Sequence, residues 1–220
     1  MKMKSYIAYA FVALSVFLHG CEETDSKGLS RLTYYAVITL DGEQWNSVPV
    51  GGTWIDPGAK ATEDGVEIDL IIGGDEVDTS TPGVYTIEYS AVNKDGYSST
   101  EYRYIGVIDP SATADLTGKY KRDAGEFGIS EVKKVEGVEN LYVTNNVGGV
   151  KAPSEATTVQ FFYYAGGDGD AVLGKIEAPY QLVFGSPFNT EGGRIKEGQY
   201  YTWKVVNSGY GPAVRHFDKQ

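Results

Sequence analysis

The residue types that most often carry chemistry are scarce in this chain. It has one cysteine, Cys21, and two histidines, His19 and His216. A single cysteine permits neither an intramolecular disulfide nor a cysteine-rich zinc site, and no Gly-rich phosphate loop or metal-binding motif is present. His216 alone cannot be given a role in a Ser–His–Asp triad. The sequence therefore predicts no catalytic residue, no metal centre and no cofactor, and we expect a protein that is not an enzyme.

Acidic side chains leave two minor options open. Glycosidases need two carboxyl groups that are close in space rather than in sequence, and among 30 acidic residues a close pair can arise by chance. The Gly-rich segment from Gly166 to Asp170 looks like a calcium loop, but an EF-hand that began at Asp168 would need Glu where the chain has Pro179. A Gly-rich β-turn explains the segment better, although a calcium site of another type at Asp168 and Asp170 stays open.

Aromatic side chains are the remaining candidates for binding a ligand. The chain has 17 Tyr and 3 Trp residues, and the runs 161–164 and 199–205 place aromatic rings on both faces of expected strands. Exposed rings beside polar groups can stack on sugar rings. The alternative, which we weight more heavily, is that these rings form the core and cross-strand aromatic pairs. The candidate ligand-binding residues are Tyr163, Tyr164, Trp203 and Trp45.

The N-terminal segment has the three parts of an export signal. Lys2 and Lys4 precede an uncharged apolar run at residues 6–18, which is too short to span a bilayer comfortably as a helix. The run ends at Leu18-His19-Gly20-Cys21, which resembles the bacterial lipobox. The resemblance implies that lipid is attached to the Cys21 sulfur and that the chain is cleaved before Cys21, which would give a stable membrane anchor. The alternative is an ordinary signal peptide with a chance cysteine.

Acidic residues follow the expected anchor at once, at Glu22, Glu23 and Asp25. In Bacteroidetes-type lipoproteins a similar acidic cluster accompanies display on the outer face of the outer membrane. The alternative is a plain solvated tether. We therefore expect an outer-membrane protein, lipid-anchored and facing the cell exterior.

The net charge of the whole chain argues against two classes of binding partner. The chain carries a formal charge of −11. Nucleic-acid binding requires clustered Lys and Arg, and adsorption to anionic lipid requires the same. We expect no nucleic-acid partner, and contact with the membrane through the lipid on Cys21.

The rest of the sequence predicts two all-β domains. Short segments with period-two alternation and turn signals fill residues 31–109, which favours a β-sandwich. A polar connector at 110–115 follows, and residues 116–220 predict about eight short antiparallel strands in a small barrel or a second sandwich. Residues 1–20 and 21–30 are the signal peptide and an acidic flexible tether. The expected strands are 32–40, 66–72, 84–92, 100–108, 116–122, 129–135, 140–146, 158–164, 171–176, 180–184, 199–207 and 214–217.

The order of turns in the first domain resembles a bacterial immunoglobulin-like domain of unknown function. The Asp56-Pro57-Gly58 turn and the strand entry at 82–85 carry this resemblance. Such domains are spacers or adhesive modules of surface lipoproteins and extracellular enzymes. With the segments 116–122 and 138–149, the chain resembles a two-domain Bacteroidetes-type lipoprotein family whose C-terminal β domain also has no known function.

These observations lead to a surface-anchored lipoprotein with a non-catalytic binding role. The ligand class we favour is a glycan, in an accessory role in polysaccharide uptake, and this rests on analogy. The alternative is a structural or adhesive module that binds other surface proteins. A hydrolase ranks third.

Overall fold

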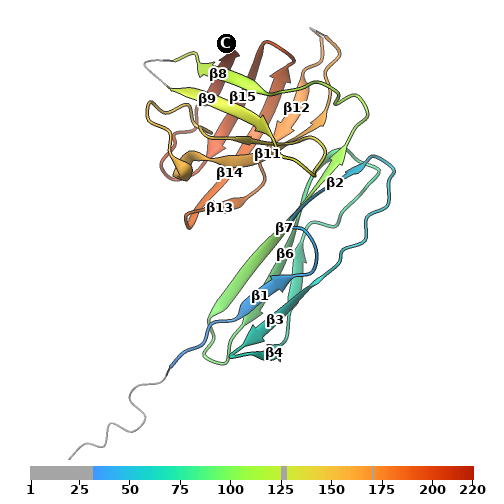
Figure 1. Ribbon diagram of the computed structural model, residues 1–220, viewed down its shortest axis with the longest axis vertical. Helices are drawn as coiled ribbons and strands as arrows, with labels where there is room; N and C mark the ends of the chain where they lie inside the picture. Colours follow the sequence, from blue (N-terminus) through green and yellow to red (C-terminus); the bar gives the residue numbers. More distant parts are fainter. Residues whose placement is uncertain (1–31, 125–127, 170) are drawn as a thin grey trace, which may run out of the picture. The chain divides into compact units, whose positions relative to one another are not determined.

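The structure is a computed structural model that describes residues 32–124, 128–169 and 171–220. The expected signal peptide, Cys21 and the acidic residues after it lie outside the described residues, as does Asp170. Residues 35–220 form one compact unit. The described part is built from β-strands and one short 3₁₀ turn, Glu155–Thr157, and contains no α-helix (Figure 1).

The first seven strands form two sheets, which we call the N-terminal sandwich (residues 35–109). One sheet has the order β1-β3-β4, and the other has the order β2-β7-β6-β5. The strands are β1 (Val37–Leu40), β2 (Trp45–Pro49), β3 (Ala59–Glu63), β4 (Val66–Ile68), β5 (Ile71–Gly74), β6 (Gly83–Val92) and β7 (Ser98–Ile108).

The apolar core of the sandwich is small. Ile87, Tyr89 and Ile105 from β6 and β7 are buried, and Ile38 and Leu40 of the opposite sheet pack against them. Period-two alternation along β6 produces this arrangement because every second side chain of a strand points to the same face of the sheet.

A buried arginine ties the loops of the sandwich together. Arg103 is fully buried on β7 and forms an ion pair with Asp56, and its Nη1 donates to the Tyr89 hydroxyl at 2.7 Å. Its Nη2 donates to the carbonyl oxygens of Asp41 at 2.5 Å and Gly58 at 3.2 Å. The Asp56-Pro57-Gly58 turn of the sequence resemblance is therefore a partner of the buried guanidinium.

The remaining strands form a closed barrel, which we call the C-terminal barrel (residues 116–220). The order β12-β11-β10-β9-β8-β16-β15-β14 closes because β12 also pairs with β14, and β13 adds to the outer edge of β14. The strands are β8 (Gly118–Arg122), β9 (Ile129–Lys134), β10 (Leu141–Thr144), β11 (Val159–Ala165), β12 (Gly174–Glu177), β13 (Gln181–Val183), β14 (Ser186–Lys196), β15 (Tyr200–Val206) and β16 (Val214–Lys219).

Aromatic side chains fill the barrel. Tyr201, Trp203 and Phe217 are buried on β15 and β16 and contact one another, with ring centroids 4.8 Å apart for Tyr201 and Trp203. Barrels of eight strands enclose a space that side chains can fill. The all-β prediction is confirmed, and the second region is a barrel rather than a sandwich.

Strand β14 was not among the expected strands, and its Gly192-Gly193 pair has the composition of a turn. In the structure the pair forms a β-bulge, where the register with β15 shifts between Glu191 and Arg194. Gly192 has φ +62°, and a Cβ on Gly193 would lie 2.0 Å from the carbonyl oxygen of Ile176. The bulge bends the strand, and β14 pairs with both β12 and β15 beyond it.

The prediction of a single strand at 66–72 is wrong. The segment divides into β4 and β5, which belong to different sheets of the sandwich. Ile71 and Ile72 are both largely exposed, at 58% and 60%, so the alternation stops where the chain changes sheets. Strands β2 and β3 were also not expected, and β2 runs parallel to β7.

The connector expected at 110–115 is fastened to the barrel. The Asp109 N–H donates to the Tyr164 carbonyl at 2.8 Å, and the Asn140 side chain donates to the Ala112 carbonyl at 2.7 Å. Tyr104 and Ile108 of β7 join the core of the barrel. The chain between β7 and β8 therefore holds a fixed path.

Within the described ranges, no helix has the length and apolar character that crossing a membrane would require.

Candidate ligand-binding cleft

Two of the aromatic candidates lie inside the barrel. Trp203 and Tyr163 each have a relative exposure of 0%. The Trp203 Nε1 donates to the Val147 carbonyl at 2.9 Å, and the Tyr163 hydroxyl donates to the Glu197 carboxylate. Neither ring reaches solvent, so neither can stack on an external ligand. Their role is packing, the alternative that carried more weight in the sequence.

Tyr164 is half-buried and packs against the same barrel core. Burial raises the pKa of its hydroxyl, and the nearby Glu177 carboxylate raises it further. The structure thus gives Tyr164 a packing role beside an acidic side chain.

Trp45 is the candidate that borders open space. It begins β2, and its ring centroid lies 4.1 Å from that of Tyr104 and 5.9 Å from that of Phe162 in the barrel. It is half-buried and lines a cleft of about 310 Å³. We call this cleft the first cleft.

The walls of the first cleft come from both regions of the molecule. Trp45, Tyr102 and Tyr104 are contributed by β2 and β7 of the sandwich, and Gln160 and Gln181 by β11 and β13 of the barrel. Binding sites often form where two such bodies meet, as a concave surface that is largely apolar with a few polar groups. This cleft combines aromatic rings with side-chain amides, and its lining is more polar than apolar.

Strand periodicity places the tyrosines. Tyr102 and Tyr104 are two residues apart on β7 and share one face, with rings 6.4 Å apart and 19° from parallel. Arg103 and Ile105 point to the other face, into the sandwich core. The Gln44 side chain donates to the Tyr102 carbonyl at 3.1 Å, and the Tyr104 N–H donates to the Gln44 carbonyl at 2.8 Å. These contacts fix the backbone beneath the rings.

The barrel side of the cleft is fixed by one glutamine. The Gln160 N–H donates to the Gln181 side-chain oxygen at 2.9 Å, and the Gln181 amide donates back to the Gln160 carbonyl at 2.8 Å. Gln181 is 8% exposed. The paired bonds attach the start of β13 to β11 and set the position of Tyr180, whose ring lies 5.3 Å from that of Tyr102.

The cleft is nearly free of charge. Burial raises the pKa of Tyr102 and of Tyr104, and nearby acidic and phenolic groups raise both further. Both hydroxyls therefore stay protonated at neutral pH and can donate hydrogen bonds. Among the described residues that line the cleft, Glu101 is the one carboxylate.

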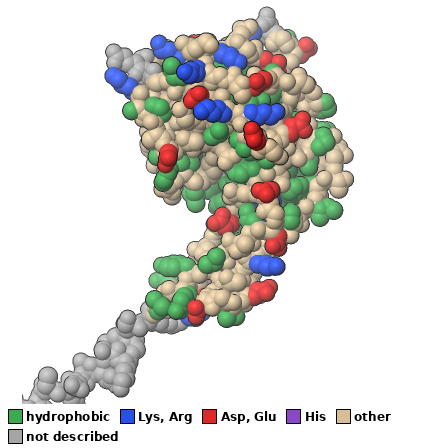
Figure 2. Space-filling model, in the orientation of Figure 1, with side chains coloured by type: hydrophobic (Ala, Val, Ile, Leu, Met, Phe, Trp, Pro, Cys, Tyr) green, Lys and Arg blue, Asp and Glu red, His purple; other side chains and the backbone are tan. Residues whose placement is uncertain are grey.

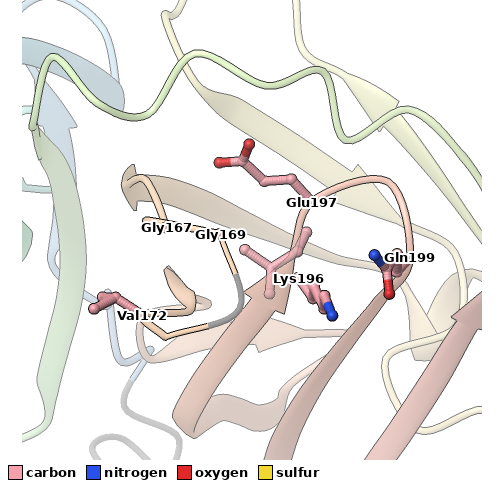
Figure 3. Close-up of a pocket in the computed structure, with 7 residues that line it drawn as sticks. Gly167, Gly169, Val172, Lys196, Glu197 and Gln199 are labelled. Carbon is pink, nitrogen blue, oxygen red and sulfur yellow. The ribbon is translucent and has the colours of Figure 1, made fainter.

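A smaller cleft of about 240 Å³ lies beside the glycine-rich segment. Lys196, Glu197 and Gln199, from the end of β14 and the turn before β15, line it together with Gly167 and Val172 of a neighbouring loop (Figure 3). The Asp168 N–H donates to the Val172 carbonyl at 2.8 Å, which makes this segment a turn. Among the residues with described positions, no three His, Cys, Asp or Glu side chains are placed to hold a metal ion.

His216 lies on the barrel surface. Its ring stacks on Tyr200 with centroids 4.4 Å apart, and its Nε2 is 3.0 Å from an Asp218 carboxylate oxygen. These neighbours account for the histidine without a reacting group.

Sequence reasoning missed most of the cleft. Tyr102, Tyr104 and Tyr180 were read only as strand residues, and Gln160 and Gln181 were not considered. The signal available was the spacing of Tyr102 and Tyr104, which predicts a shared face. Nothing in the sequence indicated that this face would meet β11 and β13.

Comparison with known proteins supports a surface location. Residues 38–107 match a family model described as bacterial surface protein, Ig-like domain. The first region is therefore a bacterial surface Ig-like domain, which confirms that part of the sequence resemblance and indicates a cell-surface or envelope protein.

Two other comparisons add little. The crystal structure of a lipoprotein from Bacteroides thetaiotaomicron is 19% identical, with a TM-score of 0.35 over 84% of this chain and 100% of that chain. A TM-score of this size does not establish a shared fold. No protein of curated function is significantly similar in sequence.

Proposed function

We propose that this protein is a surface-anchored lipoprotein that binds a glycan in the first cleft without cleaving it, as an accessory to polysaccharide uptake. The observation that carries the proposal is the combination of Trp45, Tyr102 and Tyr104 with the amides of Gln44, Gln160 and Gln181 around a cleft of about 310 Å³. Sugars present apolar C–H faces and a rim of hydroxyl groups, and this lining complements both.

Binding would divide between two kinds of contact. The partly exposed rings of Trp45 and Tyr102 offer flat apolar surface at low conformational cost, because Trp and Tyr have few rotatable bonds, and the buried Tyr104 ring supports them from beneath. The side-chain amides of Gln44 and Gln160 can donate and accept hydrogen bonds, so they match sugar hydroxyls, whereas the Gln181 amide is already bonded to Gln160 and Pro179. The bonds of Gln181 to Gln160 and of Gln44 to Tyr102 hold the cleft before a ligand arrives, which lowers the entropic cost of binding.

The absence of cleavage is part of the proposal. Glycosidases use a pair of carboxyl groups about 5–10 Å apart across the scissile bond. Glu101 is the one carboxylate among the described lining residues. A single carboxylate supports binding in preference to hydrolysis.

A glycan array probed with the chain from Ser26 onward tests the binding. We expect a restricted set of neutral glycans to be retained, and we expect Trp45→Ala to weaken retention about tenfold. Tyr97→Ala is the matched control, because Tyr97 is an exposed aromatic on the β6–β7 turn outside the cleft. Absence of retention at high protein concentration would remove the glycan hypothesis.

The anchor has its own test. Cys21→Ala should leave an unacylated precursor or a mislocalised protein, and an acylated, membrane-bound Ala variant would refute lipid attachment at Cys21. Replacement of Glu22, Glu23 and Asp25 by Ala should move the protein away from the cell exterior. Protease added to intact cells measures this, and unchanged digestion would contradict a sorting role for the acidic cluster.

A second candidate function is binding of another surface protein. It is supported by the edge strand β13 and the turn after it, where Leu182 and Phe184 respectively are 54% and 76% exposed. An apolar edge strand favours pairing with another chain. A photo-crosslinking residue at position 184 in intact cells should capture one defined partner if this function is correct, and no adduct if the edge is unused.

A further inference from the structure

The first cleft does not end at Tyr102. Tyr180, which is 40% exposed, touches Tyr102 with its ring edge, at 5.3 Å between centroids and 60° between planes. Tyr180 also lines another cleft, of about 460 Å³, which we call the second cleft. The two clefts therefore meet at a pair of tyrosines in ring contact.

The second cleft also combines aromatic rings with side-chain amides, but its lining is more apolar than that of the first. Its apolar surface comes from Tyr180, Tyr210, Pro187 and Pro212, and its polar groups include the amides of Asn189 and Asn207. Asn207 is held in place because its Nδ2 donates to the Pro187 carbonyl at 2.8 Å and to the Ser186 hydroxyl at 2.9 Å. Each cleft has the volume of a small-ligand site.

Charge is nearly absent along both clefts, although the chain carries a net charge of −11. The only Asp, Glu, Lys or Arg side chains among their described lining residues are Glu101 in the first and Lys204 in the second. Lys204 is neutralised by an ion pair with Glu191 at 2.8 Å. Buried or half-buried anionic groups of a ligand would find no cation to pair with in the first cleft.

We propose that the two clefts are one binding path for a neutral polysaccharide chain, with Tyr180 and Tyr102 as its midpoint. This inference rests on the proposed function, and it adds the length and charge of the ligand. A chain that occupies both clefts gains contacts at each without paying twice for lost rotation and translation. A monosaccharide or disaccharide would occupy one cleft and bind weakly.

The test measures how the affinity depends on the length of the oligosaccharide, and how each cleft contributes to it. Di-, tetra- and octasaccharides prepared from soluble glucans, mannans, galactans and xylans are titrated calorimetrically into the full-length protein in detergent. We expect the affinity for the bound sugar type to rise about tenfold or more from the disaccharide to the octasaccharide. Polygalacturonate and chondroitin sulfate serve as anionic probes and should not bind.

Two variants separate the clefts. Ser208 is an exposed residue of the second cleft, so Ser208→Trp fills that cleft at its surface without touching the core. It should remove most of the gain in affinity from the disaccharide to the octasaccharide. Trp45→Ala should weaken binding of oligosaccharides of every length about tenfold, and a cooperative unfolding transition verifies that each variant folds.

The outcomes distinguish the extension from the proposed function. The extended path is overturned if affinity does not change with oligosaccharide length, Ser208→Trp has no effect on affinity and Trp45→Ala lowers it. That result leaves a protein that binds a glycan in the first cleft alone. Tighter binding of the anionic probes overturns the neutral assignment. No binding of any sugar overturns the proposed function itself, and the extended path with it.

Discussion

The sandwich and the barrel are stabilised in different ways, although they share one compact unit. The barrel has a continuous aromatic core in which Tyr201, Trp203 and Phe217 contact one another. The sandwich has a smaller apolar core around Ile87 and Ile105, and a fully buried arginine supplements it. Hydrophobic burial stabilises in proportion to area, so the barrel relies on packing, and the sandwich depends more on a hydrogen-bonded charge.

The two regions also differ in their net charge. Residues 32–109 contain 3 Lys or Arg and 14 Asp or Glu, a net charge of −11, whereas residues 116–220 contain 12 of each and are neutral. In Figure 2 the Lys and Arg side chains gather over the barrel. The sandwich is therefore the strongly acidic part of the described chain, and the nearly uncharged clefts stand out against it.

The largest expected effect lies in the barrel core. Trp203→Ala should lower the free energy of unfolding by about 4 kcal/mol, because it leaves a cavity and deprives the Val147 carbonyl of its donor. Chemical denaturation followed by tyrosine fluorescence measures the change. Trp203→Phe is the milder control and should cost about half as much. A loss below 1 kcal/mol, about the worth of one surface contact, would show that the barrel does not depend on this core.

The next effect tests the arginine of the sandwich. Arg103→Met should lower the free energy of unfolding by about 3 kcal/mol, because it removes the cation that pairs with the Asp56 carboxylate and the guanidinium donor of the Asp41 carbonyl. Burial alone would raise the Asp56 pKa, but hydrogen bonds from Tyr89, Gly58 and Arg103 hold it below its ordinary value.

The double variant Arg103→Met with Asp56→Asn is the control for that prediction. It removes the uncompensated charge and should recover part of the stability, as measured in the same denaturation experiment. If the single variant is as stable as the parent, the buried ion pair contributes nothing and the contrast between the two regions disappears.

The sequence predicted the barrel strands better than the sandwich strands, for a physical reason. Short strands with apolar alternation, such as 158–164 and 199–207, were recognised because the pattern is local. Strand β3 (Ala59–Glu63) lacks strong strand formers and is paired on both sides by tertiary context. The Gly192-Gly193 bulge carries the composition of a turn and the structure of a strand.

The cleft shows the same limit at a longer range. Trp45 was named from its residue type, and the structure places it at the cleft. Tyr163 and Trp203 were named on the same basis, and both are buried in the barrel. Residue type identifies a group that can stack on a sugar, but exposure depends on which face of a strand meets the core. Which face meets the core is decided by pairing between strands that lie more than 50 residues apart in the sequence, as for Trp45 on β2 and Tyr104 on β7.

The third effect depends on pH and concerns Glu177 at the end of β12. Burial raises the pKa of Glu177 from 4.5 to about 7, and the Asp75 carboxylate of the sandwich adds to the shift. The folded state therefore holds its proton more tightly than the unfolded state does. This contribution to stability is fully present below pH 4.5 and is lost as the pH rises towards about 7.

Glu177→Gln measures that contribution. Between pH 4.5 and about 7, the free energy of unfolding of the parent should fall by up to about 3 kcal/mol relative to that of the variant. Unfolding midpoints of both proteins across that range measure the difference. The comparison is necessary because Asp56 and Asp78 have lowered pKa values and change stability in the opposite sense on acidification. Parallel curves for the two proteins would contradict a raised Glu177 pKa.

The smallest effect tests whether the two regions unfold together. Gly106 lies on β7, and a Cβ there would approach the Phe162 ring of the barrel to 2.5 Å. Gly106→Ala should cost about 2 kcal/mol, because the fully buried ring must move, and Gly106→Ala with Phe162→Leu should recover part of that loss. If the parent unfolds in one calorimetric transition and Gly106→Ala in two, the seam couples two regions of different stability. If Gly106→Ala lowers a single transition as a whole, the sandwich and the barrel are one cooperative unit despite their different cores.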